Sequence, residues 1–501
     1  MGLRTLTLID VVKRNAALFG ERTAFVFDAD RISHADYLRR VERLAAALAG
    51  LGVGAGDRIA VLSNNNAEFV ALYGAAAWLG AVLTPINWRL STEEIAYIVG
   101  DAAPKLVIAD QANQDTFRRV RPEFAAVENF IGIDGGEAPF QPLARLVGDA
   151  GAAPQPTQEP GTFVMIHTAA VAGRPRGALL SQAGLLANAL QGVASWGVTE
   201  RDVGYNALPL FHVAGLNLLL TCLYAGGTSV VVPRFEATRA VETIGAERAT
   251  MFAGFAPMLG TLLDAAGDGA RLASLRVVTG LDTPETIARF ETLCPSARFF
   301  AAFGQTETSG FVTTAPYRER PGSAGRPMGL SAVAIVDEAD RALPIGEVGE
   351  IVVRGPGVFD GYWNRLDDTA ATFRNGWHHT GDLGAFDADG YLWYRGRSAA
   401  KELIKPGGEN VYPAEVEAAL KAHPAVADAV VFGVADQEWG EAIKAVCVLQ
   451  PGAAATAQEI IDFVAGRIAR YKRPKHLAIV AELPRRDDGA VDRAATKALH
   501  R

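Results

Sequence analysis

The sequence predicts an α/β protein: a large N-terminal domain of mixed and parallel sheets flanked by helices, a β-rich subdomain, and a small, mobile α+β C-terminal domain. Three observations lead to this fold class. Apolar strands alternate with helices through much of the chain, shorter β-rich segments follow from about Ala332, and the last hundred residues carry helices and strands of their own. The predicted N-terminal domain is 1–396 and the C-terminal lid is 397–501, with a hinge at about 397–402.

The first group of elements alternates strictly. Strands are predicted in RIAVL, AVLTP and KLVIAD, and an apolar helix is predicted in AEFVALYGAAAWLG. Ser91 and Glu94 have the spacing of a capping box, so a helix is expected to begin between the second strand and the third. Three apolar strands that alternate with helices indicate a parallel sheet covered on both faces.

The same alternation returns in the middle of the chain, where TSVVVP and LRVVTG are predicted strands. The longest apolar stretch is GLNLLLTCLYAGGTSVVV, and Gly226 and Gly227 interrupt it. We therefore expect a buried helix, a turn and a strand there, with no membrane span.

The stretch IHTAAVAGRPRG, residues 166–177, follows an apolar run and precedes ALLSQAGLLANAL, which is predicted to be helical. A strand, a loop with glycine and a cation, and then a helix is a common arrangement for holding an anion.

In the C-terminal third of the chain the predicted elements become shorter and richer in strands. AVAIVD, GEIVVRG and GYLWYRGR are predicted strands, and beyond the boundary the helices PAEVEAALKAH and AQEIIDFVAGRIARY enclose the strands ADAVVFGVA and EAIKAVCVLQ. The boundary is placed where glycines and charges replace the apolar periodicity.

Composition excludes several classes of function. The formal net charge is -8 and no long basic run is present, so nucleic acid is not an expected partner. The N-terminal segment lacks a signal-peptide core, which predicts a cytoplasmic protein without integral membrane association, and a homodimer is possible. Cys222, Cys294 and Cys447 are far apart and are expected to be buried thiols in a reducing compartment.

Several short motifs are weak signals one by one. FGQTE could be a strand end with a polar cap, TGD could be a turn, and His212 in LPLFHVAGL could be a core histidine. Their order along the chain is more specific: TAAVAGRPRG, LPLFHVAGL, AAFGQTE, WHHTGDLG, YRGR, GGENVYPAEVE and LPRRDDGAVDR. In this order the chain resembles the adenylate-forming superfamily, which includes acyl-CoA and aryl-CoA synthetases, peptide-synthetase adenylation domains and beetle luciferases.

The resemblance implies a reaction in two steps. ATP converts a fatty, alicyclic or aromatic carboxylic acid into an acyl-adenylate and pyrophosphate, and the acyl group then passes to the thiol of CoA. Two anions must meet in the first step, so cations and hydrogen-bond donors are needed around the α-phosphate. By resemblance, Glu307 holds Mg²⁺, Thr306 and Arg176 contact phosphate, and His212 lies beside the carboxylate.

The resemblance also implies the remaining binding residues for ATP or AMP and for CoA. The nucleotide is expected at Thr168, Gly173, Arg176, Gly280, Leu281, Asp282, Phe303, Gly304, Gln305, Thr306, Asp382 and Arg397. The loop of Gly407 and Gly408, with Glu409, is expected to border the tunnel for the pantetheine arm of CoA.

Three departures from the family pattern stand out. Small apolar residues at 169–172 replace the Ser-Gly-Thr-Thr of the usual phosphate loop, so three hydroxyls are lost, while Arg176 replaces a lysine. The C-terminal lysine that bridges the acyl carboxylate and the α-phosphate is replaced by Ala490, for which Arg485, Arg486, Arg493 and Lys497 are candidate substitutes. The hinge contains two extra residues, and Glu402 replaces an aspartate.

These departures leave alternatives open. An adenylation-impaired relative would bind AMP or an acyl-CoA without making it, or would perform only the thioester half-reaction from a supplied acyl-adenylate. A free-standing peptide-synthetase adenylation domain is a further alternative.

Overall fold

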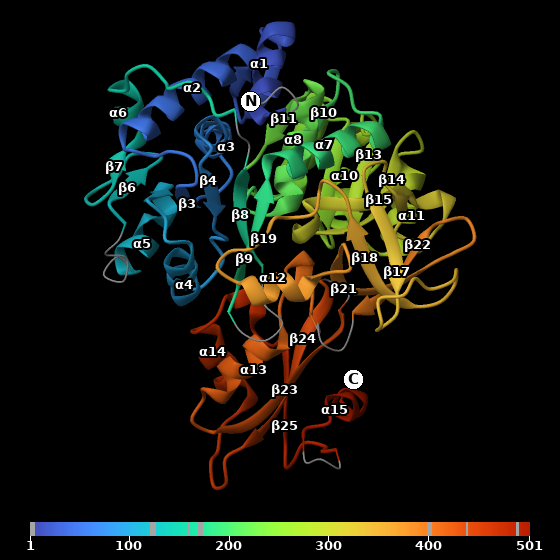
Figure 1. Ribbon diagram of the computed structural model, residues 1–501. Coiled ribbons are helices and arrows are strands. Elements are labelled where there is room, and N and C mark those ends of the chain that lie inside the picture. Colours follow the sequence, from blue (N-terminus) through green and yellow to red (C-terminus); the bar gives the residue numbers. More distant parts are fainter. Residues whose placement is uncertain are drawn as a thin grey trace.

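The structure is a computed structural model that describes residues 6–120, 127–158, 161–168, 174–397, 403–436, 439–486 and 490–500. Figure 1 shows a large body built from most of the chain and a small body, drawn in orange to red, beneath it. Within the described residues the strands form four sheets, three in the large body and one in the small one.

The first sheet is the one predicted from the N-terminal alternation. Its order is β19 (Gly361–Tyr362), β9 (Arg176–Ser181), β8 (Thr162–Thr168), β4 (Val82–Pro85), β3 (Arg58–Leu62), β5 (Leu106–Ala109), β6 (Asn129–Gly132) and β7 (Gln141–Pro142). The strands from β8 to β7 pair in parallel, whereas β9 and β19 are antiparallel additions at one edge. The predicted parallel sheet is confirmed.

The second sheet contains the middle of the chain and the N-terminal hairpin. Its order is β16 (Arg326–Pro327), β15 (Gly310–Pro316), β14 (Arg298–Gln305), β13 (Val277–Leu281), β12 (Met251–Phe255), β10 (Val203–Asn206), β11 (Thr228–Val231), β1 (Thr23–Phe27) and β2 (Asp30–Ser33). The strands from β14 to β1 are parallel, and the strands at both edges are antiparallel.

The other two sheets are antiparallel or mixed. The β-rich subdomain contains β17 (Ala332–Val336), β18 (Gly349–Arg354), β21 (Trp377–Phe386), β20 (Phe373–Arg374) and β22 (Leu392–Arg397). The small domain contains β23 (Val426–Asp436), β24 (Gly440–Leu449) and β25 (His476–Val480). An apolar cluster made only of residues beyond 403 gives the small domain its own core.

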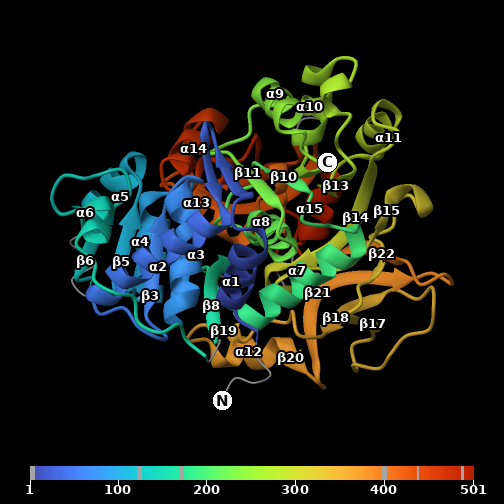
Figure 2. The ribbon, with the colours of Figure 1, turned by 90° about the horizontal axis from the view of Figure 1, so that it is seen from above.

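The described helices cover these sheets. They are α1 (Leu8–Phe19), α2 (His34–Gly50), α3 (Ala67–Leu79), α4 (Thr92–Ala102), α5 (Gln114–Val120), α6 (Leu143–Gly148), α7 (Gln182–Trp196), α8 (Val213–Ala225), α9 (Ala237–Glu247), α10 (Met258–Ala266), α11 (Pro284–Leu293), α12 (Leu366–Thr372), α13 (Pro413–Lys421), α14 (Ala457–Ala465) and α15 (Arg493–Leu499). In Figure 2, α1, α3 and α8 occupy the middle of the molecule, between the strands of the first sheet and those of the second. The largest apolar cluster joins side chains of these helices to both sheets.

Two local predictions are confirmed. The side chains of Ser91 and Glu94 each accept a hydrogen bond from the other's backbone N–H, so the capping box is present. Helix α8, a left-handed Gly226 and β11 follow one another as expected, and among the described residues no helix combines the length and apolarity needed to cross a membrane. The three cysteines are buried free thiols.

One local prediction is wrong. Residues 178–181 were expected to open a helix, but they belong to β9, and α7 begins only at Gln182. The reason is a non-local interaction: β9 folds back on β8 as an antiparallel partner, from Thr162 opposite Ser181 to Thr168 opposite Arg176. A continuous apolar run fits a buried strand as well as a helix, so periodicity alone could not separate the two.

Candidate active site

Glu307 is the centre of a buried polar cluster. It lies in a short 3₁₀ turn, Thr306–Thr308, directly after β14, and it is 7% exposed. Thr168, the last residue of β8, donates its hydroxyl to Glu307 Oε1 at 3.2 Å, and the Tyr362 hydroxyl donates to the same oxygen at 2.9 Å. Strand ends from both large sheets therefore converge on one carboxylate.

Arg176 approaches this cluster from β9. Its guanidinium lies 4.0 Å from the centre of the Tyr362 ring, and Nη1 is 3.4 Å from Asp368 Oδ1. Its buried Nε has no hydrogen-bond partner, which leaves a donor beside the Glu307 cluster. Gly173, the other residue expected from this loop, lies outside the described residues.

Asp382 is the centre of a second cluster, on β21. Gln305 Nε2 donates to Asp382 Oδ2 at 3.0 Å, while Arg397 Nε at 3.1 Å and the Tyr394 hydroxyl at 3.2 Å donate to Oδ1. The ring of Phe303 lies 6.2 Å from that of Tyr394. Gln305 is two residues from Glu307, so the two clusters are neighbours along one strand end.

The loop after β13 supplies further predicted residues. At Gly280 the backbone has φ of +137°, and an added Cβ would lie 1.7 Å from the carbonyl oxygen of Gly254, so only glycine fits between β12 and β13. Gly304 meets the same restriction, because a Cβ there would lie 2.1 Å from the carbonyl oxygen of Gly310. Leu281 is exposed, whereas Asp282 has a buried Oδ2 without a partner, and burial raises the pKa of its carboxyl.

His212 caps the N-terminus of α8. Its Nδ1 accepts a hydrogen bond from the Ala214 N–H at 3.3 Å, so Nδ1 carries no proton and Nε2 is the free donor of the neutral ring. Burial lowers the pKa of His212; Arg89 and Lys405 lower it further, against the opposing charge of Glu409. The imidazole is therefore neutral at physiological pH.

A narrow slot lies along α8, next to His212. Phe255 lines the slot, and the centre of its ring is 6.4 Å from the centre of the His212 ring. The centre of a water molecule can reach about 20 Å³ of this cavity. The lining is almost entirely apolar: Trp196, Leu208, Ala214, Asn217, Leu218, Ala253, Gly254, Phe255, Thr279, Gly280 and Phe311. Gly280, which was expected at the nucleotide, also lines this slot, whereas Phe303 belongs to another apolar cluster.

The glycine loop of the small domain faces this region. Glu409 forms an ion pair with Arg89 of the large domain, and Asn87 Nδ2 lies 3.4 Å from Glu409 Oε2. Gly407 has φ of +56° and donates its N–H to the carbonyl of Trp439 at 3.1 Å. Gly408 completes the same short turn.

Lys405 opens this loop and was missed from the sequence. Its backbone N–H donates to Glu441 at 2.7 Å. Burial and the positive charge of Arg397 lower the pKa of Lys405 to about 8, against the opposing pull of Asp382 and Glu441. The positive charge of Lys405 also lowers the pKa of His212.

A second link between the domains is a buried ion triplet. The Lys472 ammonium, 3% exposed, pairs with Glu94 of α4 and lies 2.6 Å from Glu415 of α13. Burial alone would lower the pKa of Lys472, but the two carboxylates raise it. The triplet therefore holds the small domain in the described orientation.

Two of the four candidate substitutes for the lysine lost at Ala490 form contacts within the small domain in this orientation. Arg493 lies 2.5 Å from Glu417 and donates to the carbonyl of Val431, and Arg485 lies 3.9 Å from Asp428, all within the small domain. In Figure 1, α15 (Arg493–Leu499) lies at one side of the small body, apart from α12.

The polar residues suit a magnesium ion bound mainly by a nucleotide. Within the described residues no group of three or more His, Cys, Asp or Glu side chains is arranged to hold a metal. Glu307 and the Thr168 hydroxyl would supply two oxygen donors, and phosphate oxygens would supply others, which is a usual arrangement for Mg²⁺.

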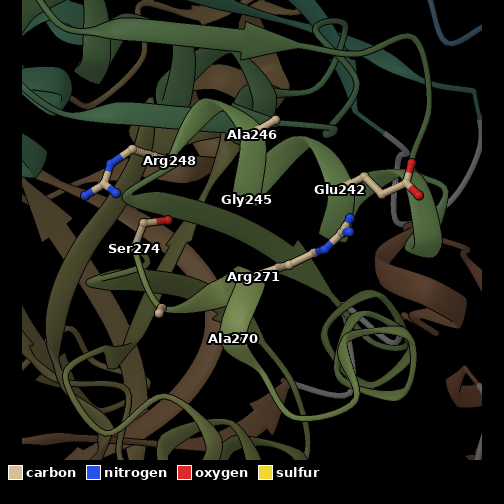
Figure 3. A pocket seen from close by; sticks show the side chains of 8 residues that line it. Glu242, Gly245, Ala246, Arg248, Ala270, Arg271 and Ser274 are labelled. Carbon is tan, nitrogen blue, oxygen red and sulfur yellow. The ribbon is translucent and has the colours of Figure 1, made fainter.

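A wider surface hollow of about 550 Å³ lies between α9 and the segment 270–274 (Figure 3). Arg248 and Arg271 point to opposite sides of it, so their guanidinium groups do not converge on one ligand. None of the predicted site residues lines it.

A nucleotide cleft between strand ends, an apolar slot beside it and a second domain closing over both define an acid-activating ligase. A family model described as "AMP-binding enzyme" matches residues 12–363, and "AMP-binding enzyme C-terminal domain" matches residues 415–489. The chain belongs to this family of adenylate-forming enzymes, and it is an AMP-forming acid–thiol ligase, as its named relatives are.

Three similar proteins are informative. Indoleacetate–CoA ligase of Aromatoleum aromaticum is 36% identical over 497 residues, covering 97% of this chain and 96% of the relative. A solved structure from Rhodopseudomonas palustris, provisionally described as a long-chain-fatty-acid CoA ligase, is 54% identical with a TM-score of 0.76, covering 79% of this chain and 100% of that one. A double mutant of o-succinylbenzoate CoA synthetase from Bacillus subtilis, bound to a product analogue, is 30% identical with a TM-score of 0.87. The match covers 97% of this chain and 98% of that one.

The Bacillus subtilis enzyme has also been solved with its acyl-adenylate intermediate. That structure is 29% identical over 97% of each chain, but its TM-score is only 0.71. Because sequence identity and coverage are nearly equal, the difference of 0.16 between the two scores reflects the arrangement of parts. As a whole, the chain therefore superposes better on the product-analogue complex than on the acyl-adenylate complex.

Proposed function

We propose that this enzyme activates a planar aromatic carboxylic acid with ATP and transfers the acyl group to CoA, giving acyl-CoA, AMP and pyrophosphate. The observation that carries the proposal is the approach of the 405–409 loop to both the Asp382 cluster and His212, at the mouth of an apolar slot. A nucleotide, an acyl group and a thiol can meet only where these three features adjoin.

In the first step, a carboxylate oxygen of the acid attacks the α-phosphorus of ATP, and the bond to the pyrophosphate oxygen breaks. The neutral His212 ring donates its Nε2–H to the carboxylate and orients it without adding charge. Asp382 accepts hydrogen bonds from the ribose hydroxyls, and Asp282 Oδ2 accepts one from the adenine amino group. Mg²⁺ held at Glu307 would neutralise phosphate charge when bound.

In the first step, Arg176 supplies a cation at the outgoing phosphates. Lys405 belongs to the lid, and its place beside Asp382 and His212 holds for the described orientation, which we assign to the second step. A lysine with a pKa of about 8 is mostly charged near neutral pH, and its charge acts on both Asp382 and His212. A preorganised cation there stabilises the negative charge that develops on the α-phosphate as AMP leaves.

In the second step, the CoA thiolate attacks the acyl carbon, and the bond to the adenylate oxygen breaks with AMP as leaving group. The glycine turn at 406–408 offers a thin wall for the pantetheine arm. The higher TM-score with the product-analogue complex supports assigning the described orientation to this step.

The acid is argued from the slot. A space with aromatic and glycine walls suits a flat ring better than a flexible chain. The indoleacetate and succinylbenzoate named for two relatives are both aromatic, which supports the same class. The fatty acid named for the Rhodopseudomonas palustris protein is the competing substrate.

The test is carboxylate-dependent pyrophosphate release with ATP and Mg²⁺, followed by thioester formation with CoA. The acids should include indole-3-acetate, phenylacetate, cyclohexanecarboxylate and palmitate. We expect pyrophosphate and thioester with an aromatic acid. Thioester from a synthetic acyl-adenylate only would favour the half-enzyme, while neither product with any acid would favour a binding protein.

A further inference from the structure

We infer that the acid carries a hydrogen-bond donor on its aromatic ring, and that Asn217 Oδ1 accepts this hydrogen bond inside the slot. The inference rests on the proposed function and narrows its substrate class. It makes Asn217 a specificity-determining residue.

The orientation of the Asn217 amide is fixed by its neighbour. Nδ2 donates to the backbone carbonyl of Ser309 at 2.6 Å, and a carbonyl can only accept. The nitrogen must therefore face Ser309, and the oxygen must face the other way. That oxygen is buried and has no hydrogen-bond partner.

A lone acceptor in an apolar cavity is costly without a partner. Leaving a buried polar group unsatisfied costs roughly 1–3 kcal/mol. Among the described residues that line the slot, the only other side-chain oxygen is that of Thr279, and its hydroxyl donates to the Phe300 carbonyl at 3.0 Å. Asn217 Oδ1 is therefore the side-chain acceptor that the slot leaves for a ligand.

The acceptor lies at a suitable depth for a ring. Asn217 follows His212 by five residues, about 7.5 Å along the helix axis. Helices α7 and α8 lie side by side and run in the same direction. Asn188 of α7 and Asn217 of α8 both face Gly310, and four residues later Gly192 of α7 faces Thr221 of α8. Trp196 is a turn beyond Gly192 and closes the slot deeper than Asn217. An acid whose carboxylate lies at His212 thus places its ring beside Asn217.

The donor must be neutral. The walls are aromatic and aliphatic, and none of the described side chains that line the slot carries a charge, so an ammonium group would lose its hydration without compensation. A ring N–H or a phenolic O–H meets both requirements, because it donates one hydrogen bond and keeps the ring flat.

The experiment compares two acids of nearly the same shape on the unmodified enzyme: indole-3-acetate, with a ring N–H, and 1-benzothiophene-3-acetate, without one. Equilibrium binding of each acid is measured by calorimetry, and turnover is measured by pyrophosphate release. We expect indole-3-acetate to bind about five- to a hundredfold more tightly, the range for one buried hydrogen bond.

Variants then assign the preference to one atom. In Asn217→Leu the two acids should bind within about twofold of each other, because the acceptor is gone. Thr279→Val is the matched control: it also changes a polar residue of the slot, but its hydroxyl already has a partner, so the preference should remain.

The outcomes separate the two proposals. A preference for the N–H acid in binding without any turnover would support the acceptor and contradict the proposed reaction. Equal binding of the two acids by the unmodified enzyme, or no binding of either, would overturn the acceptor, since a water molecule would then satisfy Asn217 Oδ1. A preference that persists in Asn217→Leu would also overturn it.

Discussion

A few charged and polar side chains provide the environment proposed for the substrate carboxylate and the phosphates of ATP. Glu307 accepts hydroxyl hydrogen bonds from Thr168 and Tyr362 on one oxygen, which fixes the direction of its carboxylate. The charges of Asp382 and Lys405 act on each other, and the pKa of Lys405 is about 8. We propose that Glu307 serves a metal ion in the first step and that Lys405 serves the departing AMP in the second.

Replacing Glu307 by Ala should abolish activity, because the bound metal would lose its carboxylate ligand. We expect a fall in pyrophosphate release of at least about a hundredfold, the usual effect of removing one preorganised electrostatic group. Glu307→Gln is the matched variant, since it can still accept from the Tyr362 hydroxyl. If the glutamine enzyme keeps most of the rate, the negative charge of Glu307 is not required.

Thioester formation should depend on the protonation of Lys405. The pKa of about 8 means that the side chain is charged below pH 8 and neutral above it, so its contribution to the rate should fall as the pH rises through this value. Lys405→Met should be slower by about a hundredfold and should lose this pH dependence. The measurement is the pH profile of thioester formation from a synthetic acyl-adenylate, from pH 6.5 to 9.5, with Lys405→Met measured beside the unmodified enzyme.

The same group has an opposite effect on stability. Unfolded lysine keeps its proton up to about pH 10.4, so between pH 8 and that value the unfolded chain binds more protons, and this group's contribution to stability rises with pH. A fall in rate above pH 8 is therefore not explained by Lys405 destabilising the fold.

Restoring the family lysine provides the control at the other position. Ala490→Lys should change the adenylation rate by only a modest factor, because we expect another cation near the C-terminus, among Arg485, Arg486, Arg493 and Lys497, to supply the charge. A large rise in this variant would mean that the chain has no substitute cation.

At the scale of elements, strands and helices meet through contacts that only particular residues allow. The closest is between β12 and β13, where Gly280 passes the Gly254 carbonyl. This contact shapes one wall of the slot and positions the loop of Asp282 at the nucleotide cleft.

Gly280→Ala should destabilise the fold. The positive φ alone costs about 1–3 kcal/mol, and the clash of the new Cβ with the Gly254 carbonyl oxygen adds to this cost. The measurement is urea unfolding. Gly260→Ala is the control: Gly260 lies inside α10, and the nearest atoms to an added Cβ are 3.9 Å away, so we expect stabilisation of up to about 1 kcal/mol. Equal effects of the two substitutions would contradict the predicted clash.

Most elements could be predicted because their signals are local. The Ser91 capping box, the interruption at Gly226 and the apolar alternation each lie within a few residues. Strand β9 could not be predicted in the same way, since its state depends on pairing with β8 across the residues between them.

The site residues that belong to a sequence motif could be predicted, whereas those outside the motifs could not. Tyr362 reaches Glu307 across 55 positions, and Lys472 reaches Glu94 across 378, so no short pattern connects them. Lys405 did have a signal, since it stands two residues before the glycine pair, but its significance depends on the burial that lowers its pKa. Asn217 carries no motif at all; only its unpaired oxygen identifies it.

At the scale of the whole molecule, the small domain is held by few polar links. The Arg89–Glu409 pair borders the cleft, and the Lys472 triplet lies at α4. The predicted mobility of the C-terminal lid would require both to break and re-form during one catalytic cycle.

Lys472→Met should therefore slow the thioester step and spare adenylation. It leaves two buried carboxylates without their cation, which destabilises the docked orientation by about 3–5 kcal/mol. The measurement is thioester formation from a synthetic acyl-adenylate beside pyrophosphate release. Lys421→Met is the control, because its ion pair with Asp428 lies within the small domain. Equal losses in both half-reactions would contradict a role in docking.

Glu94 has two separate duties, and this bears on how easily the lid can leave. Its carboxylate accepts from Lys472 and from the Ala469 N–H, yet it also accepts from the Ser91 N–H of its own helix at 2.7 Å. When the small domain departs, this second bond stays, so the acid is never stranded without a donor. The Glu94 carboxylate therefore accepts a hydrogen bond in both the docked and the undocked orientation, and undocking is reversible. A substrate that binds one orientation only modestly more tightly than the other is then enough to drive the cycle.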